Sequence, residues 1–530
     1  MGGKLSRNLG ARPAALTTGA GVVAALVLGV LPSLWFMLEF ANGHDGAGLA
    51  WITHGGRASI LRSLKVCATV GACSLAIGWP LGTAIAMLRG WRRGLAGGLL
   101  AVPLLMPPFL WAVGVQGLKA WLPFRDQVWV DGFSGHVLAS LVSGIPLVSV
   151  MTGTALAWIS GSAVDAAQLM AGDVQLKLML LRQTLPVAFG AAILAGSLAC
   201  TDVGTGQMMG FQGAAGDIHA AFATSNGFHK ASARAGITAL VFLPLAAVGS
   251  LLVSRAAHGT RFRALRQTGV PPGTQLAGRA TFVCLVLPMV MAGAGWVQIL
   301  SSGYSGPAFR DAWLVWVESL GPTVSLVLQV ALLLVLLATP LGWCLGRSKV
   351  ATQTALGLGL VVGALPSSVH ALGWLLVRSA TGIPHGSGAL AQFDMALALA
   401  ARWLLIAVWF AASARRRLPT AALDALQLTA MSPLRRWVRY VLPTAGRRLV
   451  LPAFVCAFAS LADVTAGALL QPPGQATYAM RLFGIMDNAP EKQVAAMCVT
   501  YLLAPGALLS LFALGQISES WRAAHPDCER

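Results

Sequence analysis

The sequence predicts an all-α polytopic membrane protein with about twelve transmembrane helices in two parallel six-helix repeats. Of its 530 residues, 56% are hydrophobic and only 10% are charged, whereas a soluble domain carries about 25% charged residues. The apolar runs are continuous and about 20 residues long, which is typical of membrane helices and differs from the alternation of barrel strands. Short sequence clusters also recur at an offset close to half the chain length.

The net charge of +19, from 37 Lys+Arg against 18 Asp+Glu, would suggest a nucleic-acid partner in a soluble protein. In a membrane protein, basic residues gather in cytoplasmic loops instead. We therefore expect the lipid bilayer and no nucleic acid as a partner. The 8 Cys form no CxxC pair, which favours packing roles over a disulfide framework or a metal site.

Twelve apolar stretches are expected to span the membrane. The first follows Lys4, Arg7 and Arg12 and has no small-x-small cleavage site, which predicts an uncleaved helix rather than a signal peptide. The expected spans are roughly 16–40, 66–88, 95–118, 136–159, 186–201 and 235–253, then 280–300, 323–345, 355–377, 395–412, 449–470 and 494–514. Most Lys and Arg fall in the loops that share a side with the N-terminus, which predicts that both termini are cytoplasmic.

Three clusters of residues recur in the second half at offsets of 259 to 261 residues. They are Pro80-Leu81-Gly82 with Pro340-Leu341-Gly342, then Pro107, Ala112 and Gly114 with Pro366, Ala371 and Gly373, and Asp202, Val203 and Gly206 with Asp463, Val464 and Gly467. We expect a first repeat at 1–260, a basic cytoplasmic linker at 261–279 and a second repeat at 280–530. Six spans per half is an even number, so both halves face the same way, with a pathway between them.

Two cytoplasmic loops, within 160–186 and 415–443, share a pattern that the other loops lack. Each has an acidic residue, alanines, a small residue, a basic stretch and then Leu-Pro at the next span. The candidate residues are Asp165, Ala166, Ala167, Ala171 and Gly172 in the first loop, and Asp424, Ala425, Ala430, Ser432 and Pro433 in the second. An acid favours a helix N-terminus and a small residue permits a sharp turn. Each loop is therefore predicted to form a short helix whose apolar side chains fill a groove on a partner.

These loops resemble the EAA loops of type I ABC importer permease subunits, in which Glu-Ala-Ala precedes a Gly and, further on, a Leu-Pro. Both loops here carry Asp for Glu and Ala for Gly. The resemblance covers nearly the whole chain and is greatest to fused ferric-iron permeases, with thiamine and phosphonate permeases as close relatives. It implies a channel-forming subunit in a bacterial inner membrane. The loops would dock on two copies of a cytoplasmic ATPase, and a periplasmic binding protein would deliver the cargo.

Four further residues are singled out by their position in or near the spans. Asp202 and Asp463 match acidic residues that follow the post-loop span in that family, and they are candidates for the pathway. Positions in outer loops or at helix caps are the alternative. His370 stands where the first repeat has Trp111, and a packing role is favoured over substrate contact. Arg402, near the start of the tenth span, is predicted to snorkel to the outer surface.

Two other functional classes remain as alternatives. A secondary transporter also uses parallel six-span halves, but it needs ionisable residues in mid-span, and these are nearly absent from the apolar runs. A membrane-embedded enzyme needs clustered His, Asp or Glu, whereas the 9 His are scattered without an HExxH motif. No GxxxxGK[ST] loop occurs. The chain is therefore expected to be no enzyme, to hold no cofactor or metal, and to rely on a partner for ATP hydrolysis.

Overall fold

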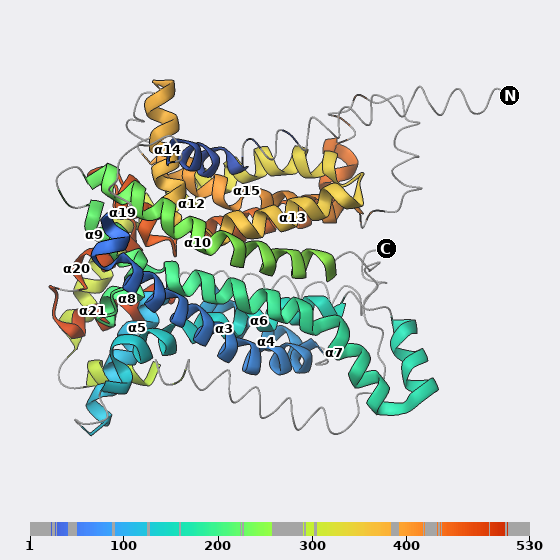
Figure 1. Cartoon of the computed structure of the whole chain (residues 1–530), viewed down its shortest axis with the longest axis horizontal. Coiled ribbons are helices and arrows are strands. Elements are labelled where there is room, and N and C mark those ends of the chain that lie inside the picture. Colours follow the sequence, from blue (N-terminus) through green and yellow to red (C-terminus); the bar gives the residue numbers. More distant parts are fainter. Residues whose placement is uncertain are drawn as a thin grey trace, which may run out of the picture. The chain divides into compact units, whose positions relative to one another are not determined.

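The regular structure of the chain is helical throughout the part that the computed structural model describes, as the sequence predicts (Figure 1). The described residues are 23, 27, 29–40, 50–86, 91–123, 128–157, 161–222, 224, 227–256, 290, 293–301, 305–382, 392–416, 418, 432, 435, 437–486, 488–503 and 506.

Helices follow one another along the whole described chain. They are η1 Ile52–Gly56, α3 Arg57–Ala86, α4 Trp91–Leu105, α5 Pro108–Gly117, η2 Leu118–Trp121, α6 Gly132–Ala157, α7 Gly161–Thr201, α8 Val203–Met208, α9 Ala214–Phe222, α10 Gly227–Ala256, α12 Gly306–Leu345, α13 Lys349–Ala364, α14 Ser367–Thr381, α15 Phe393–Arg416, η5 Trp437–Val441, α18 Leu442–Ser460, α19 Val464–Leu470, α20 Tyr478–Ile485 and α21 Glu491–Tyr501. A shorter apolar helix, Gly29–Phe40, precedes them.

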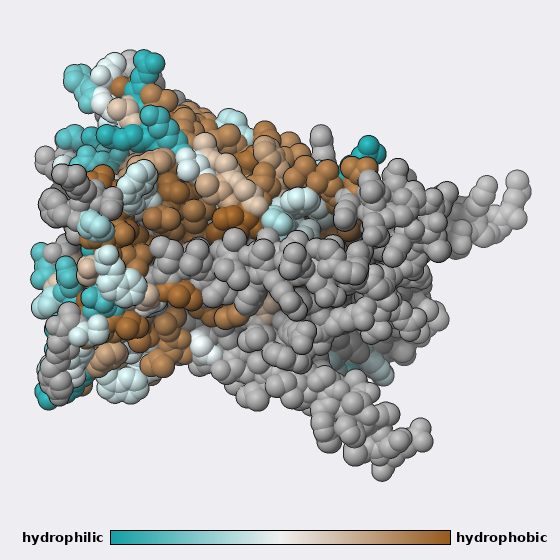
Figure 2. Space-filling view, turned by 90° about the horizontal axis from the view of Figure 1, so that it is seen from below, coloured by the Kyte–Doolittle hydropathy of each residue, from teal (hydrophilic) through white to brown (hydrophobic). Residues whose placement is uncertain are grey.

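Six described helices are long and apolar enough to cross a membrane, and the number rises to nine if each of three bent pairs counts as one span. The six are Ile52–Ala86, Gly132–Leu156, Leu178–Thr201, Phe228–Ser254, Gly306–Leu345 and Phe393–Arg416. Apolar side chains on these helices face outward, as Leu328, Leu332 and Leu336 do along α12, and Figure 2 shows hydrophobic residues over much of the described surface. We therefore treat the chain as a membrane-embedded protein.

Two of the bent pairs break at a proline in the same way. The segments Ala96–Leu105 and Pro108–Trp121 meet at 96°, as do Lys349–Ala364 and Ser367–Thr381. Pro107 is the N-cap of α5 with φ −56° and ψ 132°, and Pro366 is the N-cap of α14 with φ −53° and ψ 132°. A ψ of 132° is extended rather than helical, so the preceding helix ends at each of these prolines. The proline ring also offers no N–H to the carbonyls of the helix that ends there. The third bent pair joins Val450–Ser460 to Val464–Leu470 at 72°.

The chain forms two compact units, each containing segments from both halves of the sequence. Unit 1 comprises Met1–Arg57, Asp217–Phe262 and Pro322–Gln475, and unit 2 comprises Ala58–Gly216, Arg263–Gly321 and Ala476–Arg530. The division of the sequence into repeats at 1–260 and 280–530 stays a prediction, and the linker at 261–279 lies outside the described residues.

The core of each unit is centred on one helix. In unit 1, α15 packs against α13, α14 and α18, and Leu405 and Val408 are fully buried there. In unit 2, α6 packs against α4, α5 and α7. Gly82 of α3 lies so close to the backbone carbonyl of Ser149 on α6 that a Cβ at this position would overlap it. Small residues at such crossings let membrane helices approach closely and gain dispersion contacts.

Candidate functional site

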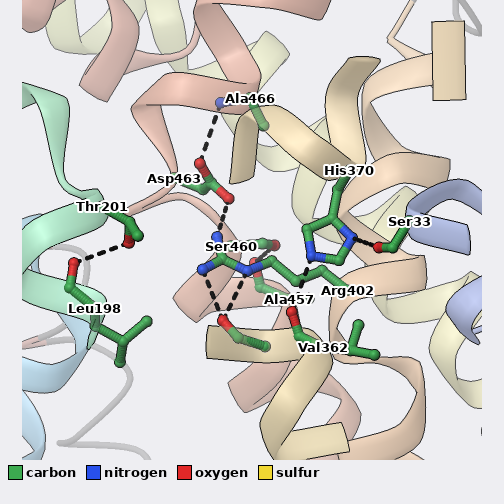
Figure 3. Close-up of polar contacts among 11 residues, drawn as sticks. Ser33, Leu198, Thr201, Val362, His370, Arg402, Ala457, Ser460, Asp463 and Ala466 are labelled. Carbon is green, nitrogen blue, oxygen red and sulfur yellow. Dashed lines mark hydrogen bonds and ion pairs between the residues drawn. The ribbon is translucent and has the colours of Figure 1, made fainter. Parts of the chain in front are cut away.

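A buried polar cluster in unit 1 surrounds the break between α13 and α14 (Figure 3). Because α13 ends at Ala364, the carbonyls of its last turn lack the i+4 partners of a continuing helix, and the Val362 carbonyl accepts from the N–H of Leu365 instead. The guanidinium of Arg402 donates two hydrogen bonds to the carbonyl of Gly363, from Nε at 3.2 Å and from Nη2 at 2.9 Å. His370 Nε2 donates to the carbonyl of Val362 at 2.9 Å. Side chains thus satisfy the carbonyls that the break exposes.

The same guanidinium forms an ion pair with Asp463 through Nη1 and Oδ2. The other carboxylate oxygen, Oδ1, accepts a hydrogen bond from the backbone N–H of Ala466 at 3.1 Å, so that Asp463 caps the N-terminus of α19. The side chains of Arg402 and Asp463 are only 9% and 5% exposed. The negative end of α13 therefore faces a cation, and the positive end of α19 faces an anion. Buried ion pairs persist where hydrogen bonds satisfy both partners in this way.

Arg402 corrects one sequence prediction. It was expected to reach the outer surface, but it lies inside unit 1, about 14 Å along the axis of α15 from Phe393. The physical reason is that the α13 carbonyls and Asp463 together offer the guanidinium more partners than a path to the surface would. Sequence reasoning missed this contact because Arg402 and Asp463 are separated by 61 positions.

His370 is held by hydrogen bonds on both ring nitrogens. Since Nε2 carries the proton that it donates to Val362, Nδ1 accepts from the hydroxyl of Ser33 at 3.0 Å. The imidazole is 1% exposed, and Figure 3 shows it between the Gly29–Phe40 helix and the end of α13. This environment is that of a packed histidine. A contact between His370 and cargo stays a prediction.

Asp202 occupies the corresponding junction in unit 2. It is the N-cap of α8, where it accepts from the backbone N–H of Gly204 at 3.1 Å and from the hydroxyl of Thr205. His136 of α6 lies nearby and interacts with Asp202 electrostatically. The helices around the two junctions also correspond. In unit 2, α8 contacts α5 and α6, and in unit 1, α19 contacts α14 and α15. Asp202 and Asp463 are both helix caps, which was the alternative to a pathway role, and that role stays a prediction.

Each unit also has an ion pair at the far end of its bent span. Lys119 Nζ lies 2.6 Å from Asp131 Oδ1 in unit 2, and Arg378 Nη1 lies 2.5 Å from Asp394 Oδ2 in unit 1. Each pair joins the end of the bent span to the start of the next long helix. Lys119 and Arg378 are 259 positions apart, the offset that separates Pro107 from Pro366. The sequence therefore contains this recurrence as well, outside the three clusters described above.

A close backbone contact accompanies each bend. In unit 1, a Cβ at Gly373 would overlap the carbonyl of Pro32 in the Gly29–Phe40 helix. In unit 2, a Cβ at Gly295 would overlap the carbonyl of Gly114. Gly114 and Gly373 belong to one of the recurring clusters. In both units, therefore, the segment after the bend touches the first predicted span of the other half, backbone to backbone.

The first predicted coupling loop lies within a helical backbone. Asp165, Ala166, Ala167, Ala171 and Gly172 all belong to the N-terminal part of α7, which Figure 1 shows bent away from the rest of that helix. Their side chains are outside the described set. The span that follows was predicted to start at Pro186, but the helix is continuous through this proline, and the candidate span Leu178–Thr201 includes it.

The second predicted coupling loop is described at one candidate position. Ser432 is exposed, and its hydroxyl accepts from the backbone N–H of Arg435 at 3.4 Å. The other candidates in this loop, Asp424, Ala425, Ala430 and Pro433, lie outside the described residues. Docking of either loop on a partner stays a prediction.

Comparisons of the chain with protein-family models, with curated proteins and with solved structures gave no match. The function is therefore inferred from the sequence motifs and from the geometry above.

Proposed function

We propose that the chain is the transmembrane permease subunit of an ATP-binding-cassette importer in a bacterial inner membrane. It would form the translocation pathway, with both termini cytoplasmic, for a cargo that a periplasmic binding protein delivers. Two copies of a cytoplasmic ATPase would supply the energy. The observation that carries the proposal is the pair of EAA-like loops, at 160–186 and 415–443, each ahead of a Leu-Pro. Ferric iron is the candidate cargo, on the resemblance to fused ferric-iron permeases.

Structural correspondences between the two halves support a tandem duplication of six spans. Each half has a span that bends by 96° at a proline, an ion pair from the end of that span to the next helix, and an aspartate that caps a short helix. Each also has a glycine-lined backbone contact beyond the bend. Two parallel six-span repeats, with a pathway between them, account for all four features.

A secondary transporter is the second candidate, and one observation favours it. The apolar runs seemed to lack ionisable residues in mid-span, yet Arg402 and Asp463 form a buried ion pair inside unit 1. Buried ionisable pairs mark ion pathways in many transporters. In the importer, the same pair would instead hold the broken span together. The two candidates differ in their energy source, which gives a direct test.

Proteoliposomes that contain the chain alone are expected to show no ferric-iron uptake under a proton or sodium gradient. Uptake is expected only when the cognate ATPase, the binding protein and ATP are all present, because the chain has no nucleotide-binding loop of its own. The measurement is accumulation of radioactive iron against empty liposomes as the control. Gradient-driven uptake without ATP would establish the secondary transporter instead.

Substitution of the small residue in either loop is expected to weaken ATPase docking. Ala171→Glu and Ala430→Glu should each reduce co-purification of the ATPase about ten-fold or more, because a bulky charge prevents close approach of the loop helix to a groove. Ala171→Ser and Ala430→Ser are the matched controls and should retain binding. Both glutamate variants should insert normally. Full ATPase recovery with both would remove these loops from the interface.

A further inference from the structure

Each unit buries a carboxylate at the junction between a long helix and a short one, but the cationic neighbour differs between the units. In unit 1 the neighbour of Asp463 is Arg402, which is charged at every accessible pH. In unit 2 the neighbour of Asp202 is His136, whose charge depends on a bound proton. Both cationic residues project from the long helix that follows the bent span, α15 in unit 1 and α6 in unit 2.

The imidazole of His136 has an unsatisfied nitrogen. The ring is 1% exposed and stacks on Phe211 with the ring centres 4.9 Å apart. Nε2 donates its proton to the carbonyl of Ala199 at 3.0 Å, so in the neutral ring Nδ1 carries a lone pair. Nδ1 makes no hydrogen bond, and it lies 3.9 Å from the position that a Cβ would take at Gly206 of α8. The backbone of Thr205, the preceding residue, also interacts with the ring. A proton on Nδ1 would therefore give the ring a second donor at the start of α8, where the Thr205 carbonyl is an acceptor.

Asp202 provides the counter-charge for a protonated ring. Of the elements packed on α6, α5 and α8 contain no charged residue, and α7 contains none at positions 187–201. The charged residues of α4 are Arg92 and Arg93 at its start, and those of α3, which contacts α6 at Gly78 and Gly82, are Arg57, Arg62 and Lys65 in its first three turns. At the N-terminal end of α6, Lys119 and Asp131 pair with each other. Among these groups, Asp202 is the one whose charge acts on the His136 ring.

We propose that His136 binds an exchangeable proton at Nδ1 and in that state neutralises Asp202, as Arg402 permanently neutralises Asp463. The proton adds to the Nδ1 lone pair, the imidazole becomes an imidazolium, and the new N–H donates to the Thr205 carbonyl. Release returns the proton to water and leaves the Asp202 carboxylate without a cation. The inference concerns a proton site in unit 2 and does not depend on the proposed function.

Solid-state NMR of the full chain in lipid, with ¹⁵N-labelled histidine, tests the site because ring-nitrogen shifts separate an imidazolium from each neutral tautomer. The His136 signals are assigned by their loss in His136→Gln, which retains an N–H donor for Ala199 but cannot titrate. Between about pH 9 and about pH 4, they should change from the neutral Nε2–H tautomer to the imidazolium. His370, bonded on both nitrogens beside Arg402, should take up its proton only at a lower pH than His136 and serves as the internal control.

Asp202→Asn supplies the second measurement. It removes the counter-charge but can still cap α8, and it should move the His136 midpoint to lower pH by about 1 to 3 units. If His136→Gln fails to elute as a folded species, Phe211→Leu provides the assignment by shifting the signals of the stacked ring alone. A His136 ring that stays neutral over the whole range would overturn the proposal, as would a midpoint that Asp202→Asn leaves unchanged.

Discussion

Replacing Arg402 with leucine is expected to destabilise the chain by about 3–5 kcal/mol, the usual cost of removing one partner from a buried ion pair. The substitution leaves Asp463 charged and without a cation, and it leaves the Gly363 carbonyl without its two donors. The midpoint of thermal unfolding, followed in detergent by size-exclusion chromatography of the heated protein, should fall accordingly. Yield of folded protein should fall with it.

Two further variants locate the source of that loss. Arg310→Leu removes an exposed arginine from α12 and should leave the midpoint nearly unchanged. Asp463→Asn introduced together with Arg402→Leu removes the stranded charge while keeping a side chain that caps α19. The double variant should therefore recover part of the lost stability. The loss that remains should come from the Gly363 carbonyl, which has no donor once Arg402 is removed. Equal midpoints for Arg402→Leu and Arg310→Leu would show that the buried pair contributes little.

Gly373→Ala is expected to destabilise the chain by about 2–3 kcal/mol, at the upper range of overpacking substitutions. The new Cβ would meet the carbonyl of Pro32, and its nearest neighbours are backbone atoms, which cannot rotate away as the end of a flexible side chain can. Gly295→Ala, which meets the carbonyl of Gly114 in unit 2, should have a similar effect. The same unfolding measurement applies.

Gly321→Ala is the matched control for these glycine variants. Gly321 lies in the interior of α12, and nothing lies within 4 Å of a Cβ built there. Alanine should therefore stabilise this helix by up to about 1 kcal/mol, because it has the higher helix propensity. A stabilising Gly373→Ala would show that the Gly29–Phe40 helix can shift away from α14 without cost.

The helical class and the presence of several apolar helices long enough to span a membrane could be predicted from composition and run length alone, but the two bends could not. Pro107 and Pro366 were recognised as recurring residues. However, Pro146, Pro244 and Pro340 lie inside continuous helices. A proline within an apolar run therefore does not by itself predict that a helix ends. The break depends on whether neighbouring groups can satisfy the freed carbonyls, as Arg402 does at Gly363.

The candidate site was predicted only in part for a related reason. Asp202 and Asp463 were identified because they recur, and a helix cap was one of the two interpretations offered. Arg402 was placed at the surface because a local sequence window contains no partner for it. Its partners come from two other helices, and only the fold brings them together. His136 was missed because a lone histidine in an apolar run carries no pattern, and its role depends on the acid beyond the end of α7.

The pairing of Arg402 with Asp463 also affects the order in which the helices can enter the membrane during synthesis. The arginine is made 61 positions before its counter-ion, which corresponds to about 3–12 s of translation at 5–20 residues per second. During that interval α15 carries an unpaired guanidinium whose insertion at the centre of a bilayer costs about 2.5–3.5 kcal/mol. This helix would consequently remain beside the translocon, or in contact with α13, until α18 and α19 emerge and deliver the carboxylate that completes it.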